Sequence, residues 1–448
     1  MIPLFCFFSI LLSLFSIIWT DIWYIVFWGL MLGFGLLLCH KEEDTPLGNC
    51  EQRMFLFCFV VYSIFTIAVA LCIHNPIIDY FINSDSSAFY IIGEEYQGTS
   101  FLSAQEEIFS EFKYRDAVAG FYIRFLLYRL GCLFQVTNLY LFSALSNVFF
   151  ASLIPVFILK MLRGTSLLNG FSLKMTYLYA LLSPIMIEVP QLTRDIHIAL
   201  IYVIILYCFL EKELMFRYFI MLILSALVYY FRQENAFYAF GIILLCLLLD
   251  FQKMNSWKYM LFPILTYLFI FLLIYIVPTA ENVVIRYNQR DFDLADSNSL
   301  AVRLFSAFPF PLDVLAKTVF CQMLPFPVTV TLNAEGVAVG ATLVSWLTPF
   351  FWLPVQICCL VFFFKNTKSL FQNNLPLTVL YLNGLLYIIT VSSAQVLTRR
   401  TMAMYPAIFL FFCLSVKEDK ASFKNIAVYT GALFFILHVI YFLLKKPL

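Results

Sequence analysis

Four arginines lie in short polar stretches that separate long apolar segments. They are Arg194, Arg232, Arg399 and Arg400, and Arg194 is followed directly by Asp195. A planar guanidinium binds phosphate oxygens bidentately, whereas a lysine ammonium is only a point charge. An Arg-Asp pair between two apolar helices is expensive in hydrocarbon and is a functional-site hypothesis by default. The set therefore predicts a phosphate-binding site, and the alternative is local ion pairs that fix tight turns, with side chains that reach lipid phosphate.

One carboxylate stands in a polar motif of its own. Asp85 lies in the serine-rich stretch from Asn83 to Tyr90. Close to a lipid surface, it is a candidate general base for an acceptor hydroxyl, or a candidate ligand for a divalent cation, Mg²⁺ or Mn²⁺, that faces a phosphate. The structural alternative, compatible with both, is that Asp85 caps a helix that starts near Ser86. The residues assigned supporting roles in the same site are Tyr90, Glu94, Glu95, Arg124, Asp195 and Glu234.

The other reactive residue types suggest no site. The four histidines are scattered without a pair at metal-ligand spacing, which argues against zinc. The 12 cysteines lie mostly inside apolar runs without a CxxC pair, so they are predicted to be small buried hydrophobes. A Walker A or GxGxxG pattern is absent from the sequence, which argues against a nucleotide-driven pump.

The composition is that of a membrane protein. Of the 448 residues, 62% are hydrophobic and 12% are charged, whereas a soluble globular chain is about 25% charged. The 52 Phe and 26 Tyr suit lipid-facing and interfacial surfaces. A net charge of +1 gives no indication of nucleic-acid binding. We therefore predict an all-α polytopic integral membrane protein that forms one domain over residues 1–448.

Apolar runs of spanning length recur along the whole chain. The first run lacks the basic segment and cleavage site of a secretory signal and is interpreted as a retained helix. With about 17 to 25 residues per span, the sequence predicts about thirteen transmembrane helices. They lie near residues 2–19, 22–39, 54–73, 138–160, 174–190, 196–210, 216–230, 236–250, 258–277, 343–364, 374–392, 401–416 and 425–443.

Two long polar stretches, residues 74–137 and 278–342, interrupt this rhythm. The short connections between the other helices carry the lysines expected of cytoplasmic loops, so both long stretches are predicted to be extracytoplasmic. Most arginines then fall on the outer side, where the positive-inside rule would not place them. This change from lysine to arginine across the membrane favours a shared phosphate-binding role over unrelated ion pairs.

The first long stretch also contains a predicted surface helix. Apolar residues recur at helical spacing from Ala117 to Phe134, and Arg124 and Arg129 lie between them. This pattern predicts a helix that lies along the outer membrane surface, and a short additional span is the alternative.

At this point the sequence resembles the polytopic GT-C glycosyltransferases, which take sugars from polyprenyl-phosphate carriers. The similarity covers roughly residues 54–250 and lies in the order of elements: an apolar helix, an outer loop with an acidic motif followed by Tyr90, a surface helix, a span, a basic turn, and a span ending in Ser183-Pro184 before Arg194. Arg400 with Pro406 is similar to the arginine-to-proline segment near the end of many members. Asp85 stands alone where many members carry two adjacent acids.

The resemblance implies a GT-C-like fold and a transferase of the cell envelope. The enzyme would move a sugar from a polyprenyl-phosphate donor to a glycan or lipid acceptor, at the outer face of the plasma membrane, in bacteria the inner membrane. Asp85 would be catalytic and the arginines would bind the donor phosphate. The turn at Arg194 is also similar to turns in bacterial O-antigen and capsule repeat-unit polymerases, which use polyprenyl-diphosphate glycans. A third reading is a lipid or glycan flippase, although the internal repeats and mid-membrane charges typical of transporters are not seen.

Overall fold

The computed structural model describes residues 22–39, 49–71, 84–110, 117–211, 216–251, 308–309, 311–323, 331–332, 338–339, 343–394 and 398–444. Nearly all of these residues are helical. The exception with regular structure is a short antiparallel pair of strands, β1 (Thr331–Leu332) and β2 (Ala338–Val339), in which Thr331 lies opposite Val339. The predicted spans near 2–19 and 258–277 lie outside the described residues.

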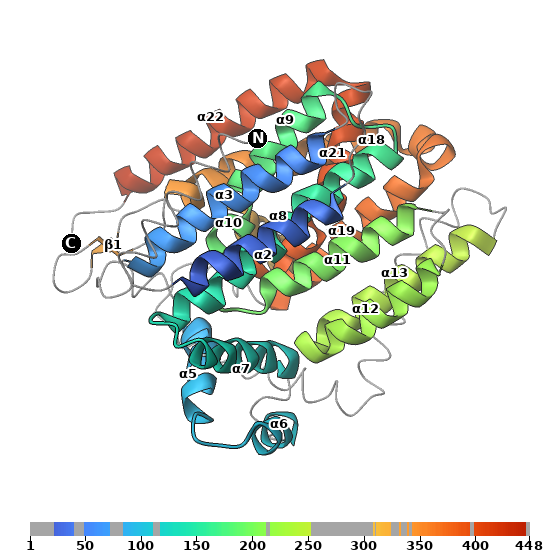
Figure 1. The fold of residues 1–448 in the computed structure, drawn as a ribbon. Coiled ribbons are helices and arrows are strands. Elements are labelled where there is room, and N and C mark those ends of the chain that lie inside the picture. The colour runs from blue at the N-terminus through green and yellow to red at the C-terminus, as the bar shows by residue number, and fades with distance from the viewer. Residues whose placement is uncertain are drawn as a thin grey trace.

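The N-terminal half of the helical bundle is built around α8 (Leu139–Gly164), whose side chains are almost all buried. Asn138 begins this helix by accepting a hydrogen bond from the backbone N–H of Leu141, as expected of an N-cap residue. The helices that pack on α8 include α2 (Trp23–Leu38), α3 (Cys50–Leu71), α9 (Gly170–Leu182) and α11 (Asp195–Leu210). Two further helices, α12 (Arg217–Phe231) and α13 (Gln233–Phe251), continue the bundle beside α11 (Figure 1).

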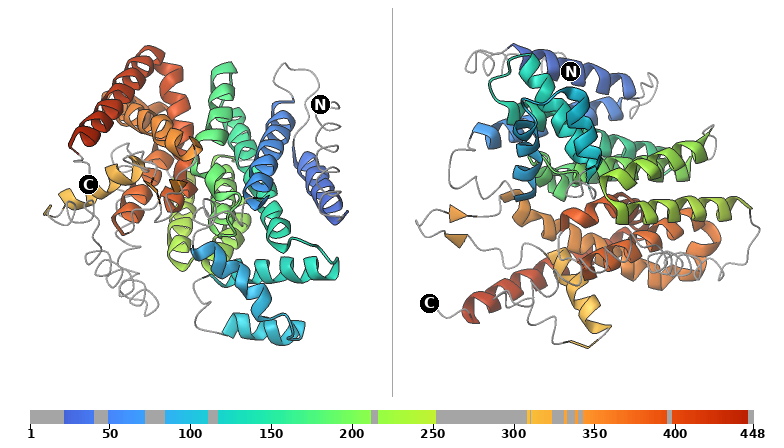
Figure 2. Two further views of the ribbon diagram at one scale, coloured as in Figure 1. Left: turned by 90° about the vertical axis from the view of Figure 1, so that its left-hand side faces the viewer. Right: turned by 90° about the horizontal axis from the view of Figure 1, so that it is seen from below.

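The C-terminal half contains the longest helix, α18 (Leu343–Asn373), which is interrupted by non-helical backbone at Asn366. It packs with α19 (Leu375–Ala394), α21 (Tyr405–Glu418) and α22 (Lys420–Leu444). Figure 2 shows these helices on one side of the molecule and the N-terminal helices on the other. Between α19 and α21, the short α20 (Thr398–Thr401) and η2 (Met402–Met404) contact the N-terminal half at α10 (Pro184–Glu188) and α11, so the turn that carries Arg399 and Arg400 lies at the junction of the halves.

Three helices of the first long polar stretch lie at one end of the bundle. These are α5 (Ser84–Glu95), α6 (Phe101–Ser110) and α7 (Val118–Leu133). In Figures 1 and 2, α7 lies across the ends of the bundle helices rather than parallel to them. The sequence prediction of a helix from 117 to 134 is therefore confirmed by α7, and its place along the membrane surface stays a prediction.

The second polar stretch, residues 278–342, is less loop-like than the sequence indicated. Its described part includes α17 (Leu312–Met323), which packs against α18 and α19. At its end, the buried Gln322 accepts a hydrogen bond from the Tyr405 hydroxyl at 2.8 Å. This segment contributes to the bundle because its apolar face and one buried amide find partners there.

Within the described residues, eight helices are long and apolar enough to cross a membrane, and α2, α11 and α12 are shorter apolar helices of 15 or 16 residues. The predicted class, a helical multi-pass membrane protein, is confirmed in this coarse form, whereas thirteen spans are not established. One predicted span, 174–190, is divided at Ser183-Pro184 into α9 and α10. Proline lacks an N–H and restricts the residue before it, which explains the break.

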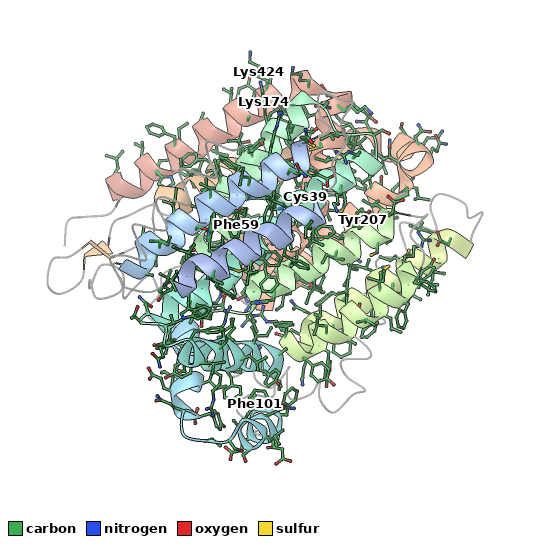
Figure 3. The ribbon with its side chains drawn as sticks, in the orientation of Figure 1. Cys39, Phe59, Phe101, Lys174, Tyr207 and Lys424 are labelled. Carbon is green, nitrogen blue, oxygen red and sulfur yellow. The ribbon has the colours of Figure 1, made fainter. Side chains whose placement is uncertain are left out.

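The two ends of the bundle carry different basic residues. Figure 3 labels Lys174 and Lys424 at the end opposite to Phe101. Lys160, near the end of α8, lies at the lysine end and pairs with Glu51 at 4.0 Å. The arginine-bearing turns at the starts of α11 and α13 lie at the other end, together with α7. Lys160, Lys174 and Lys424, which the sequence assigns to short cytoplasmic connections, therefore lie at the end opposite to these arginine-bearing turns.

Candidate functional site

Two helix N-termini meet at the arginine-rich end. Helix α11 begins at Asp195, directly after Arg194, and α13 begins at Gln233, directly after Arg232. Arg232 has an extended backbone that separates α12 from α13. Unpaired N–H groups and the helix dipole make such N-termini favourable for anions. Each helix carries an acid in its first turn, Asp195 in α11 and Glu234 in α13.

Ion pairs join these turns to the one before α21. The Arg232 Nη1 atom lies 2.9 Å from Asp195 Oδ1, and Arg399 Nε lies 4.0 Å from Asp195 Oδ2. Glu234 Oε1 lies 3.8 Å from Arg232 Nε and 4.0 Å from Arg400 Nη1. We call the six residues Arg194, Asp195, Arg232, Glu234, Arg399 and Arg400 the arginine cluster. Three turns that are far apart in the sequence therefore form one site.

Within this cluster, Arg194 is held by a hydrogen bond to the backbone. Its Nη1 donates a hydrogen bond of 2.9 Å to the carbonyl oxygen of Phe231. Burial, followed by repulsion from the Arg232 guanidinium, lowers the pKa of Arg194 to about 9. The group is still protonated at neutral pH, because its pKa lies above 7. Keeping Arg194 charged at this buried position costs free energy, and a bound anion would reduce that cost.

The turn that carries Arg399 and Arg400 is fixed from α19. The Tyr387 hydroxyl donates a hydrogen bond of 3.1 Å to the carbonyl oxygen of Arg400. Across the cluster, the Tyr202 hydroxyl of α11 donates one of 2.6 Å to the carbonyl oxygen of Asn235. Buried tyrosines thus hold the backbone, which leaves the guanidinium groups to face the carboxylates.

Charge is unbalanced within the cluster. Its four guanidinium groups face two carboxylates, and the side chains of Arg232 and Asp195 are only 5% and 4% exposed. Guanidinium groups gathered from three turns form a candidate place for an anionic ligand. Planar donors from several turns suit the oxygens of a phosphate.

Arg124, predicted as a supporting residue, has a different task. It is buried, and burial lowers its pKa to about 10. Its guanidinium donates to the carbonyl oxygens of Ser143 at 3.0 Å and Leu192 at 3.2 Å, and to Asn147 Oδ1 at 2.6 Å. Asn147 in turn donates to the carbonyl oxygen of Val189 at 3.3 Å. Arg124 therefore positions the loop before Arg194.

Replacing Arg124 by methionine should lower the free energy of unfolding by about 3 kcal/mol, because several buried acceptors lose their donor. The matched control is Arg129→Met on the same helix, whose guanidinium is partly exposed and donates to the backbone of the α5–α6 turn. Denaturant unfolding of both variants in detergent tests this difference. Equal losses would contradict a special role for Arg124.

Gly120 allows α7 to approach Arg194. A Cβ atom at Gly120 would lie 2.9 Å from the Phe89 ring and 3.3 Å from Arg194 Cβ. Phe89 of α5 also stacks on Phe121 with ring centroids 4.3 Å apart. Helices α5 and α7 therefore approach Arg194 at close range.

Substituting Gly120 by alanine should cost about 1 to 3 kcal/mol through overpacking, and it should also shift Arg194. Gly431, inside α22, is the matched control because a Cβ there meets nothing within 4 Å. Gly431→Ala should be neutral or stabilising by about 0.5 to 1 kcal/mol, since alanine favours a helix. Thermal unfolding of the two variants gives the comparison, and a stable Gly120→Ala protein would show that the contact yields easily.

Asp85 lies in the first turn of α5, which begins at Ser84. The helix thus starts before the predicted position near Ser86, so Asp85 is inside it rather than ahead of it. Its side chain lies outside the described residues. Positions 85 and 89 share one face of the helix, and Phe89 packs at Gly120 beside Arg194.

The other supporting acids and Tyr90 lie farther along α5. Glu94 and Glu95 are exposed near its end. The Tyr90 ring packs edge-on against Tyr128 and Tyr140 at 6.4 and 5.8 Å, and burial, followed by the nearby Glu94 carboxylate, raises the pKa of its hydroxyl. These three residues serve the packing and surface of α5 rather than joining the arginine cluster. Among the described residues there is no group of three His, Cys, Asp or Glu side chains that could hold a metal ion.

A large apolar cavity of about 480 Å³ opens beside the cluster. It is lined by α6, α7, α8, α11 and α12, with contributions that include Tyr122, Phe150, His197, Leu227 and Phe231. We call it the apolar groove. Phe231 joins the two sites, because its ring lines the groove while its carbonyl binds Arg194.

His197 is a residue whose place the sequence did not reveal. It lies between the rings of Phe150 and Phe231, with centroid distances of 4.8 and 5.4 Å. His197 follows Asp195 by two positions on α11, so the Arg194-Asp195 pair marked the region in which it lies. A lone histidine in an apolar run, however, gives no indication of which helices will pack on it.

Comparisons of this chain with protein-family models, with curated proteins and with solved structures find no match.

Proposed function

We propose that this protein is a membrane glycosyltransferase that moves a sugar from a polyprenyl-phosphate-linked donor to a glycan or lipid acceptor. The observation that carries the proposal is the contact between the arginine cluster and the apolar groove at Arg194 and Phe231. A lipid phosphate needs both parts, a cationic site for its head and an apolar channel for its tail. In this proposal the protein is GT-C-like and acts at the extracytoplasmic face of the plasma membrane in cell-envelope glycan assembly.

Sugar transfer requires few groups beyond the arginine cluster and the apolar groove. An acceptor hydroxyl oxygen attacks the anomeric carbon while the bond from that carbon to the phosphate oxygen breaks. The hydroxyl proton passes to a carboxylate, for which Asp85 is the candidate, and the electron pair leaves with polyprenyl phosphate. Arginines already in place stabilise the charge that develops on the departing phosphate. A divalent cation, if bound by Asp85, would supply positive charge that stabilises the same phosphate.

The decisive experiment incubates the purified protein in lipid vesicles with labelled polyprenyl-phosphate sugars and, in parallel, polyprenyl-diphosphate sugars. Consumption of the phosphate donor with transfer to added glycan acceptor supports the proposal. Failure to consume either donor, by protein that is folded and inserted, would reject it.

The repeat-unit polymerase is the second candidate, and the number of arginines favours it. Four guanidinium groups exceed what the single phosphodiester of a polyprenyl-phosphate sugar needs, and a diphosphate would engage more of them. Selective consumption of the diphosphate donor in the same experiment would decide for the polymerase. A flippase is less well supported, because the ion pairs among the described spanning helices lie at helix ends rather than at mid-depth.

The apolar groove can be tested separately from the head group. Leu227→Trp enlarges a side chain that lines the groove, and Leu222→Trp is the control on the same helix, at a position outside the groove lining. The Leu227 variant should bind farnesyl phosphate about tenfold more weakly, because each buried CH₂ of a tail contributes about 0.8 kcal/mol. Inorganic phosphate should bind both variants equally. A weaker affinity for farnesyl phosphate in both variants would mean that the groove does not hold the tail.

A further inference from the structure

His197 brings a polar side chain into the lining of the apolar groove. Apart from this histidine and two tyrosines, the side chains of the lining are hydrocarbon. His197 is 6% exposed, and within the part of the chain that the structure describes neither of its ring nitrogens has a hydrogen-bond partner. A buried polar group without a partner is costly and uncommon in folded proteins, so the position of His197 calls for an explanation.

The His197 ring is held in place by aromatic packing. Phe231 of α12 stacks on it with 18° between the ring planes, and Phe150 of α8 packs against it with 4.8 Å between the ring centroids. Both nitrogens of an imidazole lie on the ring edge, which a stacked phenyl ring leaves available. A neutral imidazole offers one N–H donor and one acceptor. The side chain is therefore oriented without use of its hydrogen-bonding capacity.

His197 lies at the end of the groove nearest the arginine cluster. It follows Arg194, the residue before α11, by three positions, which is a rise of about 4.5 Å along the helix axis. Leu200 and Ile201 continue the groove lining on the same face of α11, farther from Arg194. A molecule that lies along this face therefore presents one of its ends to His197.

The groove has the size and the access that a lipid chain requires. Its volume of about 480 Å³ lies within the range of small-molecule sites, which are mostly apolar with a few placed polar groups. Phe109, Leu227 and Tyr230 of the lining are exposed, so the groove opens at the surface of the helices. A water molecule bonded to His197 would need two to four polar partners, which hydrocarbon walls do not offer. An apolar chain with one polar end satisfies both the walls and the imidazole.

We infer that the apolar groove binds a lipid chain whose terminal oxygen forms a hydrogen bond with His197. The hydrocarbon side chains bury the chain, and the imidazole pairs with the oxygen at the end that faces Arg194. A polyprenol and a polyprenyl phosphate share this chemistry, because both chains end in oxygen. In the donor of the proposed function the oxygen belongs to the phosphate ester, and in that identification the inference rests on the proposed function.

The first test observes His197 directly. The full-length protein contains four histidines, so a sample with nitrogen-isotope-labelled histidine gives few signals in solid-state NMR of lipid vesicles, and His197→Phe identifies the one from His197. Farnesol and farnesyl phosphate should each shift the ring signals of His197, whereas the matching hydrocarbon, farnesene, should not. A shift with farnesyl phosphate alone would assign the bond to a phosphate oxygen. No shift with either probe, or the same shift with farnesene, would overturn the inference.

Binding affinities, corrected for partition into lipid, give a second test. The wild-type protein should bind farnesol about fivefold to tenfold more tightly than farnesene, the gain expected from one hydrogen bond. His197→Phe should bind both probes equally, because phenylalanine keeps the aromatic packing and lacks the donor and the acceptor. His438→Phe on α22 is the matched control, since the Nδ1 atom of His438 lies 2.8 Å from the carbonyl oxygen of Phe434. A preference for farnesol that survives in His197→Phe would contradict the inference.

Stability distinguishes a binding histidine from a structural one. Without added lipid, His197→Phe should unfold at a temperature about 1 to 2 °C higher than the wild-type protein, because a buried group without a partner is removed. A lower unfolding temperature would show that the imidazole stabilises the fold and would reject a role reserved for a ligand.

These results can be separated from the fate of the proposed function, because farnesol and farnesene carry neither phosphate nor sugar. A His197 shift with farnesol in a protein that transfers no sugar would support the lipid site and reject the transferase. Sugar transfer by His197→Phe with the wild-type KM for the donor would support the transferase and reject the role of His197.

Discussion

Replacement of Arg400 by alanine is expected to lower the rate of sugar transfer about a hundredfold, the usual loss when one preorganised donor to a developing negative charge is removed. Arg400 belongs to the arginine cluster; its side chain is 9% exposed, and its Nη1 atom lies 4.0 Å from Glu234 Oε1. Its backbone is held by Tyr387, so removal of the side chain should leave the turn in place. Initial rates with a labelled polyprenyl-phosphate donor in lipid vesicles give the measurement.

The lysine variant distinguishes phosphate binding from charge balance. Arg400→Lys keeps the charge and loses the planar pair of donors, so it should recover only a small part of the rate. Arg53→Ala is the control, because Arg53 is an exposed arginine at the lysine end of the bundle. Full recovery by lysine would mean that Arg400 only balances the charge of Glu234.

The helical architecture could be predicted from the sequence wherever a local run of apolar residues determines it. Apolar runs define spans because lipid offers no partner for backbone N–H and C=O groups, so each run must form a helix. Every predicted span that falls on described residues lies on helical structure, and one of them, 174–190, is divided into α9 and α10. The helix within residues 278–342 was not predicted because α17 is short and amphipathic. Its packing partners, α18 and α19, lie later in the sequence, so no local pattern indicates the contact.

The sequence predicted which residues form the candidate site, but not which arginine pairs with which acid. Alternating helices place the turns at Arg194, Arg232 and Arg400 at one end, which the sequence shows. The sequence motif suggested pairing within the Arg194-Asp195 dipeptide, whereas Asp195 lies 2.9 Å from Arg232, which follows a different helix. Such pairs depend on which helices become neighbours. The burial of Arg124 among backbone carbonyls depends on the same long-range packing.

The substitution Asp85→Asn is expected to lower sugar transfer by a factor of about 100 to 10,000, the range for loss of a general base, while the protein still inserts and folds. Asparagine keeps the shape of the side chain but cannot take up the proton of the acceptor hydroxyl. Asp85 lies in the first turn of α5, on the face shared with Phe89, which packs at Gly120 beside Arg194. Steady-state rates at saturating donor, with binding of farnesyl phosphate measured in parallel, separate catalysis from donor binding.

The competing role of Asp85 predicts a different pair of results. An acid in the first turn of a helix stabilises it by about 0.3 to 1 kcal/mol, so a purely structural Asp85 would lose that stability on substitution and keep its activity. Glu107→Gln on α6 is the control, because it removes an exposed acid from the same polar stretch. Normal transfer by Asp85→Asn would therefore remove Asp85 from catalysis and leave the arginine cluster as a phosphate site whose base must be sought elsewhere. Lost transfer with unchanged phosphate affinity would instead identify Asp85 on α5 as the group that accepts the proton of the acceptor hydroxyl.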